Sequence, residues 1–206
     1  MSYSHSYDWS VHHWLVGYEK QLDQLAEGIR TWNEKINLVS RKNTDALESQ
    51  HLLPSAALYR ISPFENGKSL LDIGTGGGLP GLVLAILYPH IECTLLDATL
   101  KKLTAVKDIA AQLGLDNVRT IHARIEHHHG QYDLVTGRAV TAMPRFVSWA
   151  NRHVSRKETT GGIYYWCGGE VDPALARTSY YPTKRYPLDE YCENEHLKGK
   201  YIAYFK

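Results

Sequence analysis

The sequence predicts an α/β protein with a mostly parallel, seven-stranded sheet and a helical extension at its N-terminus. Short apolar runs alternate with helical patterns from residue 69 to residue 154, which is typical of βαβ units. A glycine cluster follows the first apolar run, and an apolar stripe with helical spacing precedes it. The chain has 206 residues, 43% of them hydrophobic, which is enough for one such domain with an appendage.

The N-terminal region, residues 1–66, is predicted to be a helical extension of a domain over residues 67–206. Its apolar side chains recur at spacings of four and three residues, so one face of a long helix docks on another element. A second helix is predicted over Thr44–Tyr59. The stripe of the first helix consists of Tyr18, Leu22, Leu25, Ile29, Trp32 and Ile36.

Seven strands are predicted, each a short apolar or aromatic run bounded by turn signals. We expect the last two to pair as a hairpin. Gly114 is expected to end the helix that follows the second strand. The predicted strands are 69–73, 91–96, 117–122, 132–136, 161–166, 180–188 and 200–205.

Five glycines follow the first strand within eight positions, and we expect them to form a ligand-binding turn that leads into a helix. Glycine allows a backbone to approach a ligand closely and adopts positive φ readily. Pro80 suits the first position of a helix whose free N–H groups face the turn. A tight turn without a ligand is the simpler alternative, which this many glycines disfavour. The glycines are Gly74, Gly76, Gly77, Gly78 and Gly81.

Two classes of ligand use a turn of this kind. Residues 76–81 fit the dinucleotide pattern G-x-G-x-x-G, with Asp97 about 20 residues further on. Asp72, however, puts a carboxylate just before the turn, where it disfavours a pyrophosphate and favours a cationic ligand. Residues 72–78, D-I-G-T-G-G-G, resemble motif I of S-adenosylmethionine-dependent methyltransferases with the Rossmann-like class I fold. Asp97 then resembles the acid that binds the ribose hydroxyls.

Motifs elsewhere in the chain add a family resemblance. They are Trp32-Asn33, Ile36-Asn37-Leu38, His51-Leu52-Leu53, Ser55, Leu71–Pro80, Leu95–Asp97, Arg124–Glu126 and Arg138–Val140. Together they resemble the RsmG (glucose-inhibited division protein B) family, bacterial methyltransferases that act on guanine nitrogen 7 in 16S rRNA. The resemblance covers most of residues 32–142 and implies S-adenosyl-L-methionine as cofactor. The implied cofactor-binding residues are Asp72, Gly74, Gly76, Gly78, Leu79, Asp97, Ile125, Glu126 and Arg138.

Arg138 is the one candidate catalytic residue. It follows the fourth predicted strand, where this fold places reacting groups, and we expect it in a loop outside the core. Its guanidinium suits the carboxylate of the cofactor or an RNA phosphate. Thr136–Ala139 stands where many amine methyltransferases carry an Asn/Asp-Pro-Pro-aromatic motif. Guanine nitrogen 7 has a free lone pair and needs no general base, so positioning of the reactants suffices.

Three places depart from the family pattern, and one of them is the segment after Gly169, which is short and rich in tyrosine. Pro54 stands where an aspartate usually follows His-x-Leu, and Trp166–Gly169 replaces Ala-Leu-Lys-Gly, so a lysine that could face RNA or substrate is missing. One alternative function is therefore a methyltransferase-fold protein that serves as a non-catalytic rRNA-binding or ribosome assembly factor. A nicotinamide-dependent oxidoreductase is another, although no catalytic Tyr-x-x-x-Lys or His/Asp pair is evident.

Composition limits the remaining possibilities. The net charge of +1 means that contacts with nucleic acid depend on local basic groups. The three cysteines share no short spacing, which argues against a disulfide framework and a zinc site. We expect His127–His129 to form a solvated loop and no metal to bind. Without an apolar span or a signal sequence, we expect a cytoplasmic monomer whose partner is small-subunit rRNA or a ribosomal subunit precursor.

Overall fold

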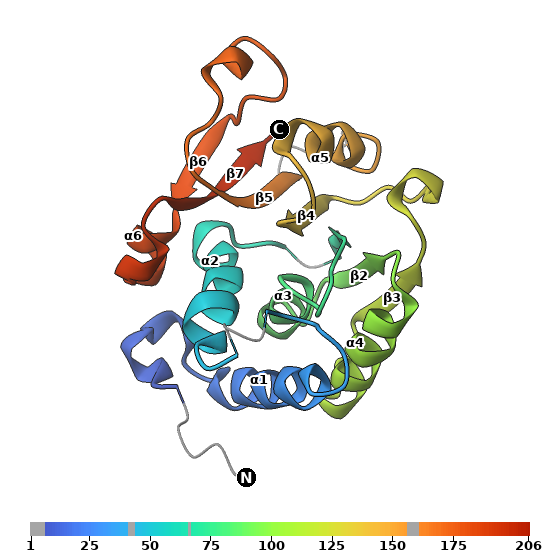
Figure 1. Ribbon diagram of the computed structural model, residues 1–206, viewed down its shortest axis with the longest axis vertical. Coiled ribbons are helices and arrows are strands. Elements are labelled where there is room, and N and C mark those ends of the chain that lie inside the picture. The colour runs from blue at the N-terminus through green and yellow to red at the C-terminus, as the bar shows by residue number, and fades with distance from the viewer. Residues whose placement is uncertain (1–6, 41–43, 66, 156–160) are drawn as a thin grey trace.

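A seven-stranded mixed sheet organises the protein (Figure 1). The computed structural model describes residues 7–40, 44–65, 67–155 and 161–206. The strand order is β3-β2-β1-β4-β5-β7-β6; the first five are parallel and β7 is antiparallel to both its neighbours. The predicted fold class and closing hairpin are confirmed. The strands are β1 (Ser69–Ile73), β2 (Glu92–Asp97), β3 (Val118–His122), β4 (Leu134–Arg138), β5 (Gly162–Gly168), β6 (Lys184–Pro187) and β7 (Lys200–Phe205).

Helices cover both faces of the sheet. On one face α3 and α4 pack against β2, α2 packs against α3 and α6, and α1 crosses outside α3 and α4 (Figure 1). On the other face α5 packs against β4 and β5. The strand order reverses between β1 and β4, which is where open α/β sheets bind ligands. The helices are α1 (Glu19–Asn33), α2 (Leu53–Ile61), α3 (Gly81–Leu87), α4 (Leu100–Gln112), α5 (Met143–Ala150) and α6 (Leu188–Cys192).

Successive residues of β1 face opposite layers. Leu70 joins the hydrophobic cluster under α2 and α3, whereas Leu71 and Ile73 join the cluster under α5. This alternation follows from the pleat of a strand. Because both faces are covered, the strand is a nearly continuous apolar run, as is usual in parallel sheets.

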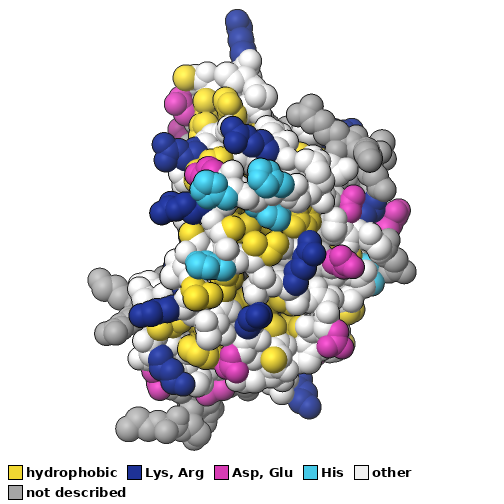
Figure 2. Space-filling model, turned by 90° about the vertical axis from the view of Figure 1, so that its right-hand side faces the viewer, with side chains coloured by type: hydrophobic (Ala, Val, Ile, Leu, Met, Phe, Trp, Pro, Cys, Tyr) yellow, Lys and Arg dark blue, Asp and Glu magenta, His cyan; other side chains and the backbone are white. Residues whose placement is uncertain are grey.

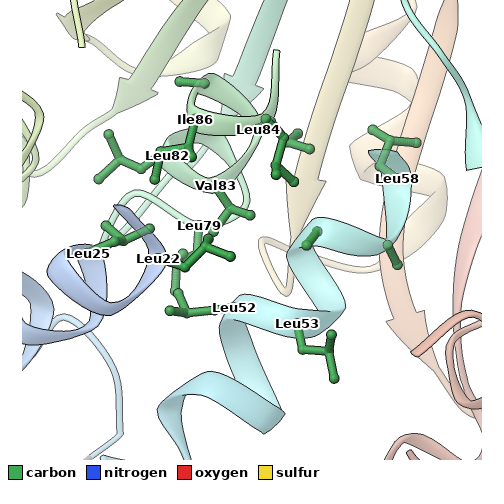
Figure 3. Packing of buried hydrophobic residues seen from close by; sticks show 14 of the residues in the cluster. Leu22, Leu25, Leu52, Leu53, Leu58, Leu79, Leu82, Val83, Leu84 and Ile86 are labelled. Carbon is green, nitrogen blue, oxygen red and sulfur yellow. The ribbon is translucent and has the colours of Figure 1, made fainter. Parts of the chain in front are cut away.

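The N-terminal helices pack directly on the glycine turn. Figure 3 shows Leu22 and Leu25 of α1 and Leu52, which precedes α2, around Leu79 at the end of the turn. The first three side chains are fully buried, and burial of each leucine stabilises the fold by about 1.5–3 kcal/mol. The predicted apolar stripe is thus confirmed at its central positions. The division into residues 1–66 and 67–206 stays a prediction, because one hydrophobic cluster includes residues of both parts.

A close crossing of α1 and α4 depends on a helical glycine. A Cβ added at Gly28 would lie 3.2 Å from Ile109 Cγ1, so a larger residue would require the Ile109 side chain to shift by a few tenths of an ångström. Near the crossing Trp32 Nε1 donates a hydrogen bond of 2.7 Å to Asp108 Oδ2. The partly buried Trp32 therefore serves the structure, as the apolar stripe indicated.

The second helix and the sixth strand differ most from their predicted ranges. The second helix is split into a π-helical turn, η4 (Glu48–Leu52), and α2, which continues from it. The sixth strand begins only at Lys184, not at Tyr180. Thr178 accounts for this difference, because its side chain accepts the N–H of Tyr180 at 3.2 Å and its carbonyl accepts the N–H of Tyr181 at 3.1 Å. Pro182 has no N–H to offer a neighbouring strand.

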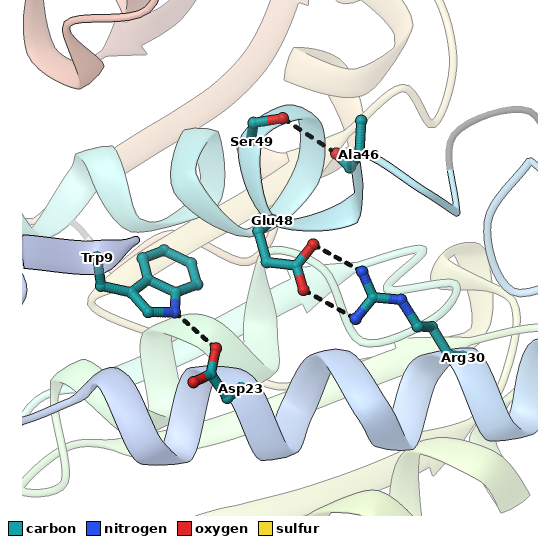
Figure 4. A network of polar contacts seen from close by, with 6 residues as sticks. All are labelled: Trp9, Asp23, Arg30, Ala46, Glu48 and Ser49. Atoms are coloured by element: carbon teal, nitrogen blue, oxygen red, sulfur yellow. Dashed lines mark hydrogen bonds and ion pairs between the residues drawn. The ribbon is translucent and has the colours of Figure 1, made fainter. Parts of the chain in front are cut away.

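A polar network joins α1 to the segments on either side of it (Figure 4). Arg30 donates two hydrogen bonds, of 2.8 and 2.7 Å, to the two carboxylate oxygens of Glu48. Trp9 Nε1 donates to Asp23 Oδ1 at 2.7 Å. The side chains of Arg30 and Glu48 are only 14% and 7% exposed, so their pairing compensates the desolvation of both charges.

We expect Glu48→Gln to lower the free energy of unfolding by about 3 kcal/mol, because it leaves the Arg30 charge half-paired in a nearly dry site. The matched control is Glu193→Gln, which removes the exposed partner of Arg60, a carboxylate that is 64% exposed. That change should cost less than about 1 kcal/mol. Urea denaturation of both variants measures the difference, and equal losses would contradict the prediction.

Candidate functional site

The glycine turn between β1 and α3 has the backbone conformation that its composition predicts. Gly74, Gly76 and Gly78 have φ values of 65°, 57° and 89°, a region that other residues rarely adopt. A Cβ at Gly78 would also lie 2.4 Å from Leu82 Cδ1, and one at Gly74 would lie 3.0 Å from Val140 Cγ1. The glycines therefore meet both a conformational and a packing requirement.

Asp72 lies beneath this turn and is completely buried. Its Oδ2 accepts the N–H of Gly81 at 3.1 Å, and its Oδ1 accepts the hydroxyl of Thr136 at 3.0 Å. Burial raises the pKa of this carboxyl to about 6, against the lowering effect of its hydrogen bonds. The side chain thus ties β1 to the start of α3 and to β4. It does not line the neighbouring pocket, so any effect on a bound ligand is electrostatic rather than by contact.

Asp97 is the last residue of β2 and is 8% exposed. Its Oδ2 accepts the N–H of Gly76 at 2.9 Å, and its Oδ1 accepts the N–H of Thr99 at 2.8 Å. The structure therefore brings the acid of the second strand against the glycine turn, as the spacing predicted. The carboxylate keeps further lone pairs for a ligand, since it can accept about four hydrogen bonds.

A pocket of about 170 Å³ lies at the carboxyl ends of β1, β2 and β3. Of the predicted cofactor-binding residues, Gly74, Asp97, Ile125 and Glu126 line it. The walls also include apolar side chains such as Val140 and Trp149. Gly78 and Leu79 do not line it and are buried in the structure behind the turn. The pocket thus combines apolar walls with two carboxylates.

The side chains of the three consecutive histidines that follow Glu126 in the chain do not converge on one point. His127 and His129 are exposed, whereas His128 Nε2 lies 3.0 Å from the hydroxyl of Tyr132. The ring of His128 also lies 5.3 Å from that of His153. Within the described ranges, no group of three or more His, Cys, Asp or Glu side chains is arranged to hold a metal ion.

Arg138 is the final residue of β4 and is not in a loop, so the predicted location was wrong. The strand continues two residues beyond its predicted end because Gly137 and Arg138 pair with Tyr165 and Trp166 of β5. The guanidinium donates to the carbonyl of His51 at 3.1 Å and to His51 Nδ1 at 3.0 Å. Burial lowers the pKa of Arg138 to about 10, so the group stays charged at neutral pH.

His51 is a site residue to which the sequence analysis assigned no role. Arginine has no acceptor, so His51 Nδ1 accepts the hydrogen bond from Arg138 and the ring proton is on Nε2. Nε2 is buried and has no hydrogen-bond partner among the described residues. His51 lies in the π-helical turn η4, a conformation found frequently at functional sites. Only the family motif around His51 could have indicated it.

A second pocket, of about 260 Å³, opens at the ends of β4 and β5, and we call it the inner pocket. His51 and Arg138 line one side of it, and Lys200 from β7 lines another. Pro54 and Leu188 contribute apolar wall. Among the described residues that line it there is no Asp or Glu, so its ionisable side chains offer donors rather than carboxylates.

The pKa of His51 predicts how stability changes with pH. Burial, together with the charges of Arg138 and Lys200, lowers this pKa to about 4, whereas the unfolded value is about 6.5. Between pH 6.5 and 4 the unfolded chain therefore binds a proton at His51 that the native chain does not, and the native state loses stability as the pH falls.

We expect the His51→Gln variant to lack the loss of native-state stability that protonation of His51 causes between pH 6.5 and pH 4. The stability advantage of the wild type over His51→Gln should be largest above pH 7 and should shrink by roughly 3 kcal/mol at most by pH 4. Asp72 acts in the opposite sense, because its pKa is raised, but its contribution is present in both proteins and cancels. Urea denaturation at several pH values gives the difference, and a constant difference from pH 4 to 7 would contradict the prediction.

Comparisons with known proteins agree with this geometry. A family profile described as "GidB: rRNA small subunit methyltransferase G" matches residues 18–165. Proteins named Ribosomal RNA small subunit methyltransferase G from Flavobacterium psychrophilum and Christiangramia forsetii are 37% and 36% identical over 187 residues, 89% of this chain and 88% of each relative.

Among solved structures, a mutant of MtNAS in complex with S-adenosylmethionine matches 95% of this chain and 75% of its own, with a TM-score of 0.56 and 18% identity. This likeness shows the fold alone. The extent of the profile match and the identity to the relatives decide the family: the chain belongs to the rRNA small subunit methyltransferase G (GidB) family.

Proposed function

We propose that this protein transfers a methyl group from S-adenosyl-L-methionine to guanine nitrogen 7 in small-subunit rRNA. The observation that carries the proposal is a pair of pockets at the carboxyl edge of the sheet. The first pocket has the carboxylate of Asp97 at the end of β2. The second is the inner pocket, whose described lining residues offer hydrogen-bond donors and include no carboxylate. Family membership favours an enzyme over the non-catalytic alternative.

The first pocket suits the adenosine part of the cofactor. Its apolar walls, which include Ile125 and Val140, fit a flat ring, and Asp97 offers carboxylate oxygen to ribose hydroxyls. Glu126, which is exposed at the rim, can accept a further hydrogen bond. The positive φ angles of Gly74 and Gly76 let the backbone of the turn approach the rest of the molecule. Asp72 adds negative charge beneath, which suits a sulfonium.

Among the described residues that line the inner pocket, none fits the role of a general base. His51 carries its ring proton on Nε2 and has a pKa lowered to about 4. Burial raises the pKa of Cys167, which also lines this pocket, to about 11, so the thiol stays protonated. These residues cannot remove a proton from an exocyclic amine at neutral pH. They are compatible with a nucleophile that already has a free lone pair.

The reaction then depends on positioning. The bound cofactor supplies the electrophilic methyl group. The Nε2–H of His51 is buried and has no partner among the described residues. A small opening of the inner pocket around it would let it donate to the O6 of guanine, one of two acceptors on that edge of the base, and would leave nitrogen 7 available. Arg138 holds His51 in this orientation through two hydrogen bonds. The apolar wall of Pro54 and Leu188 excludes water from the space between the reactants.

The distribution of charge bears on the RNA partner. Figure 2 shows basic side chains scattered among acidic and uncharged ones on the face that it presents, and the net charge is +1. We therefore expect recognition of the RNA through a few local contacts.

None of the helices in the described ranges is long and apolar enough to cross a membrane. The monomeric state and the cytoplasmic location stay predictions.

We expect Asp97→Asn to bind S-adenosyl-L-methionine about 10- to 100-fold more weakly, because hydrogen bonds to a charged acceptor contribute about 1.5–3 kcal/mol. The amide oxygen can still accept one of the two backbone N–H groups, so the fold should persist. Asp116→Asn is the matched control, since Asp116 is exposed at the opposite end of the sheet. Calorimetry measures both affinities. Absence of binding heat for the wild type would contradict the cofactor assignment.

We expect the rate of methyl transfer to vary little between pH 6 and pH 8, because no proton leaves before the transfer.

Arg138→Lys should lower kcat by up to about 100-fold without changing cofactor affinity, since an ammonium cannot reproduce the two hydrogen bonds of the guanidinium to His51. Single-turnover assays with small-subunit rRNA measure both effects. A steep one-proton profile centred near pH 7 would indicate base-assisted transfer to an amine instead.

A further inference from the structure

A second hollow, of about 400 Å³, lies beside the inner pocket, and we call it the outer groove. Lys200 lines both of them. It begins β7 and lies opposite Gly168 of β5, where a Cβ added to the glycine would be 3.6 Å from Lys200 Cγ. Lys200 therefore lies where the two spaces meet.

Lys200 brings an ammonium to the strand end where the sequence analysis found a lysine missing. That expected lysine would stand at Gly168, which pairs directly with Lys200. The cation reaches the site from β7 rather than from β5. The positive charge of Lys200 also contributes to the lowered pKa of His51, which agrees with the position of both residues at the inner pocket.

The outer groove carries a second cation. Arg185 of β6 lines it, with its guanidinium carbon 5.8 Å from the centre of the Tyr201 ring. This cation–π contact is weak at an exposed site and favours a position of the guanidinium beside the groove. Neither Arg185 nor Lys200 forms an ion pair with a carboxylate of the described residues. Both are exposed and available to an anionic ligand.

Two carboxylates also line the outer groove. Glu170 and Asp189 lie among its walls, so the formal charges of its lining residues sum to zero. The groove therefore does not suit a highly charged ligand such as a nucleoside triphosphate. A diester phosphate carries a single negative charge, which Lys200 can meet on the side of the inner pocket, where the described lining residues include no carboxylate.

We propose that Lys200 and Arg185 bind the backbone phosphate next to the nucleotide whose base enters the inner pocket. This inference rests on the proposed function and names how its RNA is held. A guanidinium can contact two phosphate oxygens at once, and an ammonium acts as a point charge beside them. The shared position of Lys200 places the phosphate at the mouth of the base site, so the contact sets the register of the strand rather than the identity of the base.

The test measures the affinity for an unmodified small-subunit rRNA transcript at several salt concentrations, with wild type, Lys200→Ala and Arg185→Ala. The matched control is Lys198→Ala, because Lys198 is exposed two residues from Lys200 and lines neither space. Each of the first two variants should reduce the slope of log affinity against log salt by about 0.7, the value for one phosphate on a single strand. Lys198→Ala should keep the wild-type slope.

Activity assays on the same proteins separate this inference from the proposed function. Lys200→Ala and Arg185→Ala should raise KM for RNA several-fold, whereas Lys198→Ala should keep both kcat and KM at the wild-type values. Slopes for Lys200→Ala and Arg185→Ala equal to that of Lys198→Ala would overturn the phosphate site, even if methyl transfer occurs. Conversely, a slope that depends on Lys200 in a protein that transfers no methyl group to rRNA would support the phosphate site and reject the proposed function.

Discussion

The buried carboxylate of Asp72 is the interaction on which the rest of the site depends. It belongs to β1, accepts the N–H of Gly81 at the start of α3, and accepts the hydroxyl of Thr136 on β4. Three elements therefore converge on one side chain beneath the glycine turn. The free N–H groups at the start of α3 carry partial positive charge, which offsets part of the cost of burying this carboxylate. The turn above it is held in place from below.

Glycine is required wherever this arrangement brings backbone close to a neighbour. A Cβ at Gly81 would lie 1.9 Å from Leu95 Cδ2 and 2.9 Å from Asp72 Oδ2, so α3 could not approach the carboxylate. On the other side of the turn, Asp97 accepts the N–H of Gly76. The two acids thus hold the turn from two strands, and the pocket lies at the carboxyl edge between them.

The N-terminal helices contribute to the site as well as to the core. The carbonyl and Nδ1 of His51 accept from Arg138 of β4, and the hydroxyl of Ser55 lies 3.4 Å from the same guanidinium. This contact joins the helical segment to the end of the fourth strand and fixes the tautomer of His51. One wall of the inner pocket is therefore supplied by residues that precede β1 in the chain. Removal of those helices would open the site as well as expose their apolar face.

The sequence by itself determined the order of the elements, the glycine turn and the two acids at the ends of β1 and β2, because these are local patterns of period, spacing and backbone freedom. It did not determine that Arg138 continues β4, since that depends on pairing with Trp166 of β5. It also did not indicate that His51 and Lys200 meet across one pocket, 149 positions apart in the numbering. Only the tertiary structure decided this, because contacts between distant segments arise from packing of complete layers and leave no periodic signal in the chain.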